Sequence, residues 1–132
     1  MIHFLKIKQS DIDEAESLLG FNIPKPLTKF YLKYGYGNLP SKYNSNLFMH
    51  PVTAANFRLM SEEFENFPDI DFYAEYNKSK FVFFEANETA FFAVNIDGTN
   101  ENVYYRDIVI ANSIKEFLVK MVENEDYYLS LT

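Results

Sequence analysis

The histidine, serine and carboxylate side chains are the groups in this sequence that could carry out chemistry. The chain has two histidines, His3 and His50, and no cysteine, so a thiolate nucleophile is absent. A serine nucleophile would need a tight turn such as G-x-S-x-G to present it to a histidine, and the sequence contains no such turn. We therefore expect no catalytic residues and no enzymatic activity.

Ligands for a metal ion or a cofactor are equally scarce. Neither the H-E-x-x-H zinc pattern nor the EF-hand calcium loop occurs. Asp69 and Asp71 place two carboxylates on one face of an extended segment, where a solvated turn is a simpler interpretation than a weak cation site. Gly35-Tyr36-Gly37 lacks a phosphate-binding glycine pattern and follows a predicted helix, so we interpret it as a helix stop. We expect neither a metal nor a cofactor.

Charge is unevenly distributed along the chain, whose formal net charge is −7. Residues 1–58 carry seven bases and four acids, whereas residues 59–132 carry five bases and fifteen acids. An acidic protein is a poor ligand for nucleic acid, because phosphate binding requires clustered Lys and Arg. The acidic half is either a solubilising face or an electronegative surface for a basic protein, and charge alone does not choose between them.

Aromatic residues are more numerous than one small core requires, with 14 Phe and 10 Tyr in 132 residues. Most of them are expected in the core, since each ring contributes a large apolar area. Tyrosines on strand faces can instead anchor a protein interface, because Tyr gives contact area at a small entropic cost. We regard Tyr73 and Tyr104 as candidate anchors of this kind.

Length and composition predict one globular domain over residues 1–132. The chain is 48% hydrophobic and 23% charged, which excludes a disordered protein. No run approaches the roughly 20 apolar residues of a membrane span, and the N-terminal residues lack the apolar core of a signal peptide. Together with the absence of cysteine, these features predict a cytoplasmic protein without a membrane partner.

Two short helices are predicted within residues 12–39. Asp11 is placed to cap the first helix, and Gly20 is suited to the left-handed turn that ends it. Pro26 fits the first turn of the second helix, which ends at Gly35. The second helix has an apolar face and a basic face: Leu27, Phe30, Tyr31 and Tyr34 on one side, and Lys25, Lys29 and Lys33 on the other.

The middle of the chain predicts antiparallel strands. Residues 80–86, 89–96 and 101–106 are aromatic and β-branched runs, and Asn87-Glu88 is a two-residue hairpin candidate between the first two. Residues 72–76 could add another strand. These runs indicate a meander of three or four strands.

Two segments on either side of the meander complete the prediction. Residues 47–49 suit a brief strand, and residues 52–64 are ambiguous but suit a short helix with Thr53 as a cap. Asn112 or Ser113 is expected to cap a C-terminal helix, and Ser113 has Glu116 at capping-box spacing. The apolar face of that helix comprises Ile114, Phe117, Leu118, Met121 and Val122.

These elements predict an α+β fold. We expect an antiparallel twisted sheet of about four to six strands, with the two N-terminal helices and the C-terminal helix packed on one face. The other face of the sheet is expected to be partly open.

The order of motifs resembles the SUKH superfamily, which includes fungal cell-wall synthesis regulators and many bacterial toxin-immunity proteins. The opening motifs that carry the resemblance are Ile12, Glu16, Leu19-Gly20, Ile23-Pro24, Phe30-Tyr31-Leu32 and Tyr34-Gly35-Tyr36-Gly37. Residues 111–121, AxSxxEFLxxM, are similar to the closing helix of the family. Gly-Tyr-Gly replaces the commoner Asn-Gly-Gly ending of the second helix. The resemblance covers nearly the whole chain and implies a SUKH-like fold.

The resemblance also implies a function, that of an immunity protein that binds a cognate toxin. If the toxin is a nuclease, its phosphate-binding groove is basic, and an acidic partner can occupy the groove and exclude the substrate. We expect this interface to contain carboxylates and two aromatic anchors, namely Asp69, Asp71, Tyr73, Glu75, Glu85, Glu88, Asp97, Glu101 and Tyr104.

Two other functions stay open at this point. A regulatory or scaffold module would bind an endogenous protein or peptide instead of a toxin, as the fungal relatives suggest. A small enzyme would require an enclosed pocket with converging polar groups. In each of the two binding functions we expect a monomer or a weak dimer.

Overall fold

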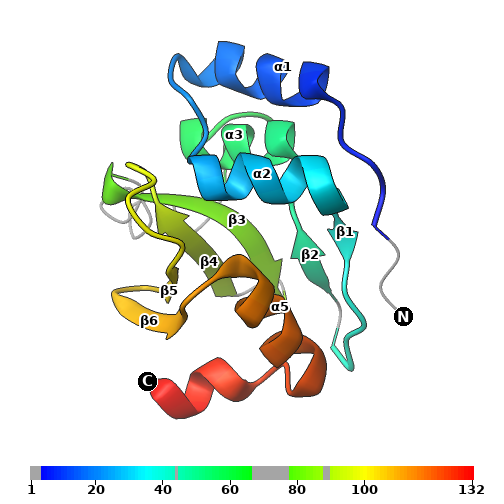
Figure 1. Cartoon of the computed structure of the whole chain (residues 1–132), viewed down its shortest axis with the longest axis vertical. Coiled ribbons are helices and arrows are strands. Elements are labelled where there is room, and N and C mark those ends of the chain that lie inside the picture. Colours follow the sequence, from blue (N-terminus) through cyan, green and yellow to red (C-terminus); the bar gives the residue numbers. More distant parts are fainter. Residues whose placement is uncertain (1–3, 44, 67–77, 88–89) are drawn as a thin grey trace.

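A six-stranded antiparallel sheet organises the protein (Figure 1). The computed structural model describes residues 4–43, 45–66, 78–87 and 90–132. Within them the strands lie in the sheet in chain order, β1-β2-β3-β4-β5-β6, and each pairs antiparallel with the next. Their bounds are β1 Gly37–Asn38, β2 Asn46–Phe48, β3 Lys80–Ala86, β4 Ala90–Asn95, β5 Val103–Tyr105 and β6 Ile108–Ala111. The predicted α+β class is confirmed.

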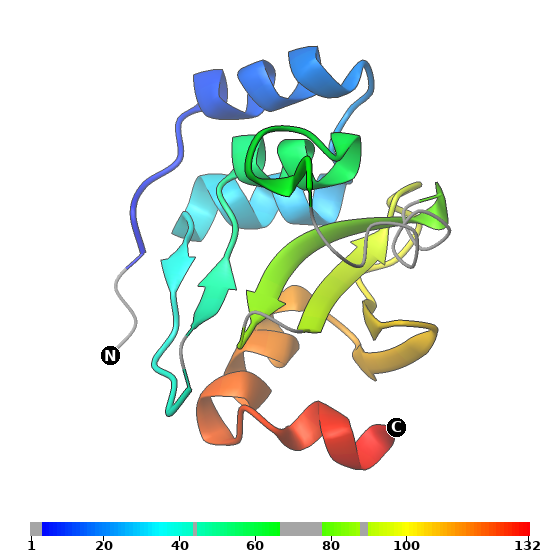
Figure 2. The same ribbon diagram turned by 180° about the vertical axis from the view of Figure 1, so that it is seen from behind.

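The helices form two groups on either side of the long β3–β4 hairpin. The α-helices are α1 Gln9–Leu19, α2 Lys25–Tyr34, α3 Pro51–Leu59 and α5 Ile114–Glu123, and the short 3-10 helices are η1 Glu62–Phe64 and η2 Tyr127–Leu131. Figures 1 and 2 show α1, α2 and α3 together at one end of the molecule, and α5 with η2 at the other. Helix α1 lies against α3, and α2 meets α5.

Aromatic packing shows that helices cover both faces at the centre of the sheet. In β4, the ring of Phe91 lies 4.7 Å from Phe57 of α3, and the ring of Phe92 lies 5.1 Å from Phe117 of α5. Consecutive residues of a strand point to opposite faces, so α3 and α5 lie on opposite sides of the sheet. Helix α3, whose helical state the sequence left ambiguous, therefore covers the face that we expected to be partly open.

The first helix begins earlier than predicted. Helix α1 starts at Gln9, so Asp11 is its third residue and not its cap. The backbone N–H of Lys8 donates to Oδ2 of Asp11 at 2.8 Å, which satisfies an amide that the helix itself leaves unpaired. Asp11 thus plays the part that the third helical residue has in a capping box, where its side chain accepts the backbone N–H of the N-cap residue. Gly20 ends the helix with φ 78°, as predicted.

Gly35 allows the N-terminal segment to lie against the end of α2. Leu5 and Tyr36 exchange two backbone hydrogen bonds, of 2.8 and 3.0 Å. Gly35 has φ 92°, and a Cβ at this position would lie 2.0 Å from the carbonyl oxygen of Leu5. A side chain is therefore excluded both by backbone conformation and by space.

The strands agree with the predicted runs, and two further strands, β1 and β6, were not predicted. The runs at 80–86, 89–96 and 101–106 correspond to β3, β4 and β5. The additional strand β6 follows a turn in which Arg106 has φ 56°, a conformation that the Arg-Asp sequence does not signal. Residues 72–76 and the hairpin position Glu88 lie outside the described residues.

The two later helices have different caps. Helix α3 begins at Pro51 and not after Thr53, because Nδ1 of His50 accepts the backbone N–H of Val52 at 3.0 Å. The cap of α5 is Ser113, one of the two predicted candidates, since its Oγ accepts the N–H of Glu116 at 3.0 Å. The predicted apolar face of α5 is buried except for Val122, which is 50% exposed.

We expect Gly35→Ala to destabilise the fold by more than about 3 kcal/mol, because strained backbone and the clash with Leu5 act together. Gly20→Ala is the matched control, since Gly20 also has a positive φ but has no atom within 4 Å of the place that a Cβ would occupy. The control should lose only about 1–2 kcal/mol. Urea unfolding measures both values. Equal losses of unfolding free energy in the two variants would show that the clash with Leu5 contributes nothing to the destabilisation.

The cap of α5 predicts a pH dependence. A hydrogen bond from the backbone of Asn112, and then one from Lys120, lower the pKa of Glu116 below its ordinary value of 4.5. Because the pKa of Glu116 is lower in the folded protein than in the unfolded chain, the ionised carboxylate stabilises the fold at any pH above the unfolded pKa. This stabilisation is lost as the pH falls through the pKa of the folded state. Glu116→Gln should therefore lose stability less steeply than the wild type below pH 4.5. Urea midpoints from pH 7 to pH 3 measure this slope, and Glu14→Gln in α1 is the control.

Candidate functional site

The connection between β4 and β5 brings together three of the predicted interface residues, Asp97, Glu101 and Tyr104. Oδ1 of Asp97 accepts the backbone N–H of Thr99 at 3.0 Å and its hydroxyl at 2.8 Å. These two hydrogen bonds lower the pKa of Asp97. Asp97 is exposed, so it presents a fixed, ionised carboxylate at the surface.

Lysines surround this group of residues. The ammonium of Lys80 lies 4.5 Å from the ring centroid of Tyr104, whose hydroxyl oxygen accepts a hydrogen bond from Asn95 at 3.2 Å. Glu101 lines a surface depression of about 370 Å³ together with Lys25 and other lysines of α2. The negative field of Asp97 and Glu101 is thus partly balanced by neighbouring cations.

Glu85 lies apart from these three residues. It is half-buried in β3, where it pairs in register with Leu47 on one side and Phe91 on the other. Five residues of strand separate it from Lys80, a span of about 17 Å. The other five residues predicted for the interface, which are Asp69, Asp71, Tyr73, Glu75 and Glu88, lie outside the described residues.

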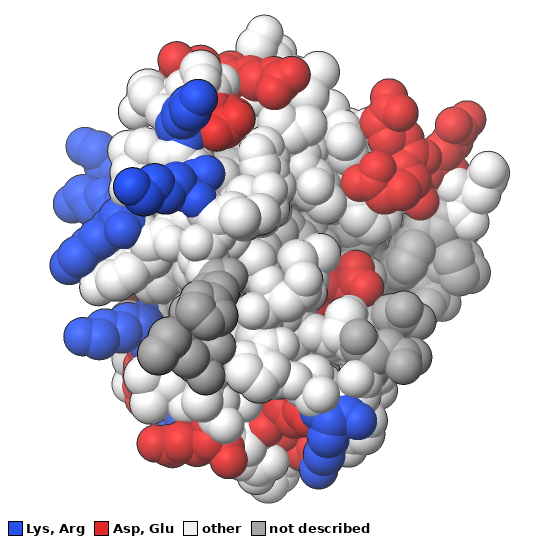
Figure 3. Space-filling model, turned by 90° about the vertical axis from the view of Figure 1, so that its right-hand side faces the viewer, with Lys and Arg blue, Asp and Glu red and all other residues white. Residues whose placement is uncertain are grey.

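On the face shown in Figure 3 the basic side chains are gathered and the acidic ones are spread out. Figure 3 shows carboxylates in several separate groups on this face, whereas most of the visible Lys and Arg side chains lie along one flank. In the described chain, the 3-10 helix η1 and the residue that follows it form one compact acidic group, because Glu62, Glu63 and Glu65 are all exposed within four residues. Helix α2 contributes Lys25, Lys29 and Lys33, and contains no acidic residue.

A second surface feature is an apolar groove between α2 and α5, with a volume of about 580 Å³. Its walls include two valines of α5, Val119 and Val122, which are 49% and 50% exposed, and Tyr34 of α2, which is 43% exposed. The residues that line it are Phe4, Phe30, Tyr34, Lys115, Leu118, Val119, Val122 and Glu123.

The groove adjoins the lysine-lined depression, and the two share Phe30, Tyr34 and Lys115. We call the combined feature the lysine-rimmed groove: the eight residues that line the apolar groove, with Lys25, Lys29 and Lys33 on its rim. The sequence predicted the lysine face of α2 but did not predict that this face lies beside α5. A signal was present in α5, where Lys115, Val119 and Val122 repeat at i, i+4 and i+7 beside the core-facing stripe.

Metal-binding clusters and membrane-spanning helices are both absent from the residues that the structure describes. Among them, no three His, Cys, Asp or Glu side chains are grouped so as to hold a metal ion. None of the described helices combines the length and the apolar character that crossing a membrane requires.

The architecture and the order of motifs define the class of protein. Residues 6–120 match the SMI1 / KNR4 family (SUKH-1), and the chain belongs to this family. Over 130 residues the chain is 42% identical to a protein of Bacillus subtilis (strain 168) that is named Immunity protein YxxD. The match covers 97% of this chain and 88% of that relative. The resemblance found in the sequence is thereby confirmed.

Proposed function

We propose that this protein is an immunity protein, which binds a cognate bacterial toxin and neutralises it without catalysing a reaction. The observation that carries the proposal is the 42% identity, over 97% of the chain, to a relative named an immunity protein. Identity at this level over 97% of the chain favours a shared mode of action. The proposed place of action is the cytoplasm of the cell that makes the protein.

We further propose that the toxin is a nuclease and that carboxylates of the acidic half of the chain contact it. Charge supports this proposal, since residues 59–132 carry fifteen acids against five bases. A nuclease must hold phosphates with cations, and an acidic partner can block that groove and associate rapidly through electrostatic steering. Asp97 is suited to such a role because its carboxylate is exposed and the hydrogen bonds from Thr99 lower its pKa.

The test neutralises six carboxylates of the proposed interface and keeps their shapes: Asp69→Asn, Asp71→Asn, Glu75→Gln, Glu88→Gln, Asp97→Asn and Glu101→Gln. The probe is the purified product of the adjacent gene, taken as the candidate toxin, and we expect its binding to weaken at least tenfold at low salt. The association rate should fall, and the affinity should depend less on salt. Stopped-flow and calorimetric titrations at several salt concentrations measure these quantities.

A second variant with the same net charge is the control. It neutralises six exposed carboxylates outside the proposed set: Asp13, Glu14, Glu62, Glu63, Glu65 and Asp107. If both variants bind the toxin equally, the location of the charges is irrelevant and the acidic interface is wrong. If the wild type neither binds the toxin nor protects cells that express it, the proposal of an immunity protein is wrong, and regulation of an endogenous protein becomes the better interpretation.

A further inference from the structure

We propose that the lysine-rimmed groove is a second docking surface, which takes an acidic segment of the toxin. Apolar side chains of that segment would enter the groove between α2 and α5, and its carboxylates would reach the lysines on the rim. The identity of the partner rests on the proposed function. The surface and the chemistry that it selects rest on the groove itself.

The apolar part of the groove is formed by side chains that the fold leaves uncovered. Val122 belongs to the apolar face predicted for α5, yet it is half exposed, as is Val119 one turn before it. On the opposite wall, the ring of Phe30 lies 4.6 Å from Tyr34 and stacks at 5.3 Å on Phe48 of the core. That wall is therefore held in place before any partner arrives, so little ordering is required on binding.

The charged rim carries four lysines against two carboxylates, Glu101 and Glu123, so its sign is opposite to that of the protein as a whole. Lys25, Lys29 and Lys33 recur every four residues, which places them on one face of α2, and Lys115 joins them from α5. Like charges at this spacing destabilise a helix, and none of the four makes an ion pair within the part of the chain that the structure describes. An acidic partner would remove this repulsion.

The shape and charge of the groove favour a protein segment over a nucleic acid. A phosphate backbone would gain nothing from the valines and aromatic rings, and a chain of net charge −7 repels a polyanion. The lysines from 25 to 33 span about 12 Å of helix, which corresponds to roughly two turns of a bound helix or four residues of an extended segment. The expected occupant is thus short, with two or three apolar side chains and adjacent Asp or Glu.

Two matched double variants separate the contributions of charge and apolar contact. Lys29→Gln with Lys33→Gln removes charge from the rim, and Val119→Gln with Val122→Gln removes apolar surface from the groove. All four side chains are exposed, so the fold should tolerate the changes, and thermal unfolding checks this. The probe is the purified product of the adjacent gene, taken as the candidate toxin and titrated calorimetrically at several salt concentrations against the full chain.

We expect each double variant to bind the toxin at least tenfold more weakly than the wild type. The lysine variant should also show a reduced dependence of affinity on salt, whereas the valine variant should keep the dependence of the wild type. The controls are Lys6→Gln with Lys8→Gln, which alters exposed lysines outside the groove, and Val109→Gln on β6, an exposed valine outside the groove. Both controls should bind within twofold of the wild type.

The outcomes distinguish this inference from the proposed function. If the wild type binds the toxin and both groove variants bind it equally well, the groove is not the docking surface, and the proposed function stands. If the groove variants instead abolish a dimer seen by analytical ultracentrifugation and still bind the toxin, the occupant is a second copy of this chain, and the inference is wrong. If the wild type does not bind the toxin at all, both the inference and the proposed function fail.

Discussion

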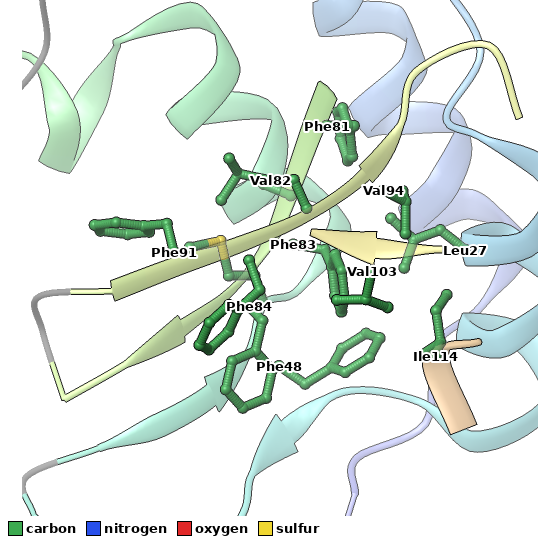
Figure 4. Packing of buried hydrophobic residues seen from close by; sticks show 14 of the residues in the cluster. Leu27, Phe48, Phe81, Val82, Phe83, Phe84, Phe91, Val94, Val103 and Ile114 are labelled. Carbon is green, nitrogen blue, oxygen red and sulfur yellow. The ribbon is translucent and has the colours of Figure 1, made fainter. Parts of the chain in front are cut away.

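The packing around Phe48 is the contact on which the rest of the structure depends. This ring, at the end of the short strand β2, meets Phe30 and Tyr31 of α2 and Phe83 and Phe84 of β3 at centroid distances between 5.2 and 6.4 Å (Figure 4 shows Phe48 beside Phe83 and Phe84). It is fully buried, so one side chain ties the N-terminal helices to the centre of the sheet. A three-residue strand provides little hydrogen bonding of its own, which makes this apolar contact the main constraint on the position of α2.

The position of α2 in turn determines which side chains reach the surface. Tyr31 points inward, and its hydroxyl donates to the carbonyl of Met49 at 2.6 Å, which satisfies a polar group within the core. With Tyr31 fixed, helical geometry directs Lys25, Lys29 and Lys33 outward and leaves Phe30 at the boundary between core and groove. The lysine face is thus a consequence of core packing and not of a mobile surface segment.

The sequence predicted the elements better than it predicted their contacts. Local signals sufficed where they were strong, as in the cap at Ser113, the turn at Gly20 and the aromatic run of β3. They were insufficient for β6, because Arg106 takes a positive φ without a residue type that signals it. Within the candidate interface, the spacing of residues along the sequence could not predict that Glu85 lies apart from Asp97 and Glu101. Nor could it show that α5 and α2 meet and form a groove, since that depends on tertiary packing between residues more than 80 positions apart.

The two proposed docking surfaces, one acidic and one rimmed by lysines, would have a physical consequence for recognition. An acidic surface alone attracts any basic protein, including many that bind nucleic acid. It therefore raises the association rate more readily than it provides specificity. The lysine-rimmed groove would repel basic segments and would take an acidic one only where its apolar side chains fit between Phe30 and Val122. A partner that satisfies both surfaces must carry both signs of charge in the right relative positions. The two surfaces together would therefore discriminate between similar toxins more sharply than the net charge of −7 suggests.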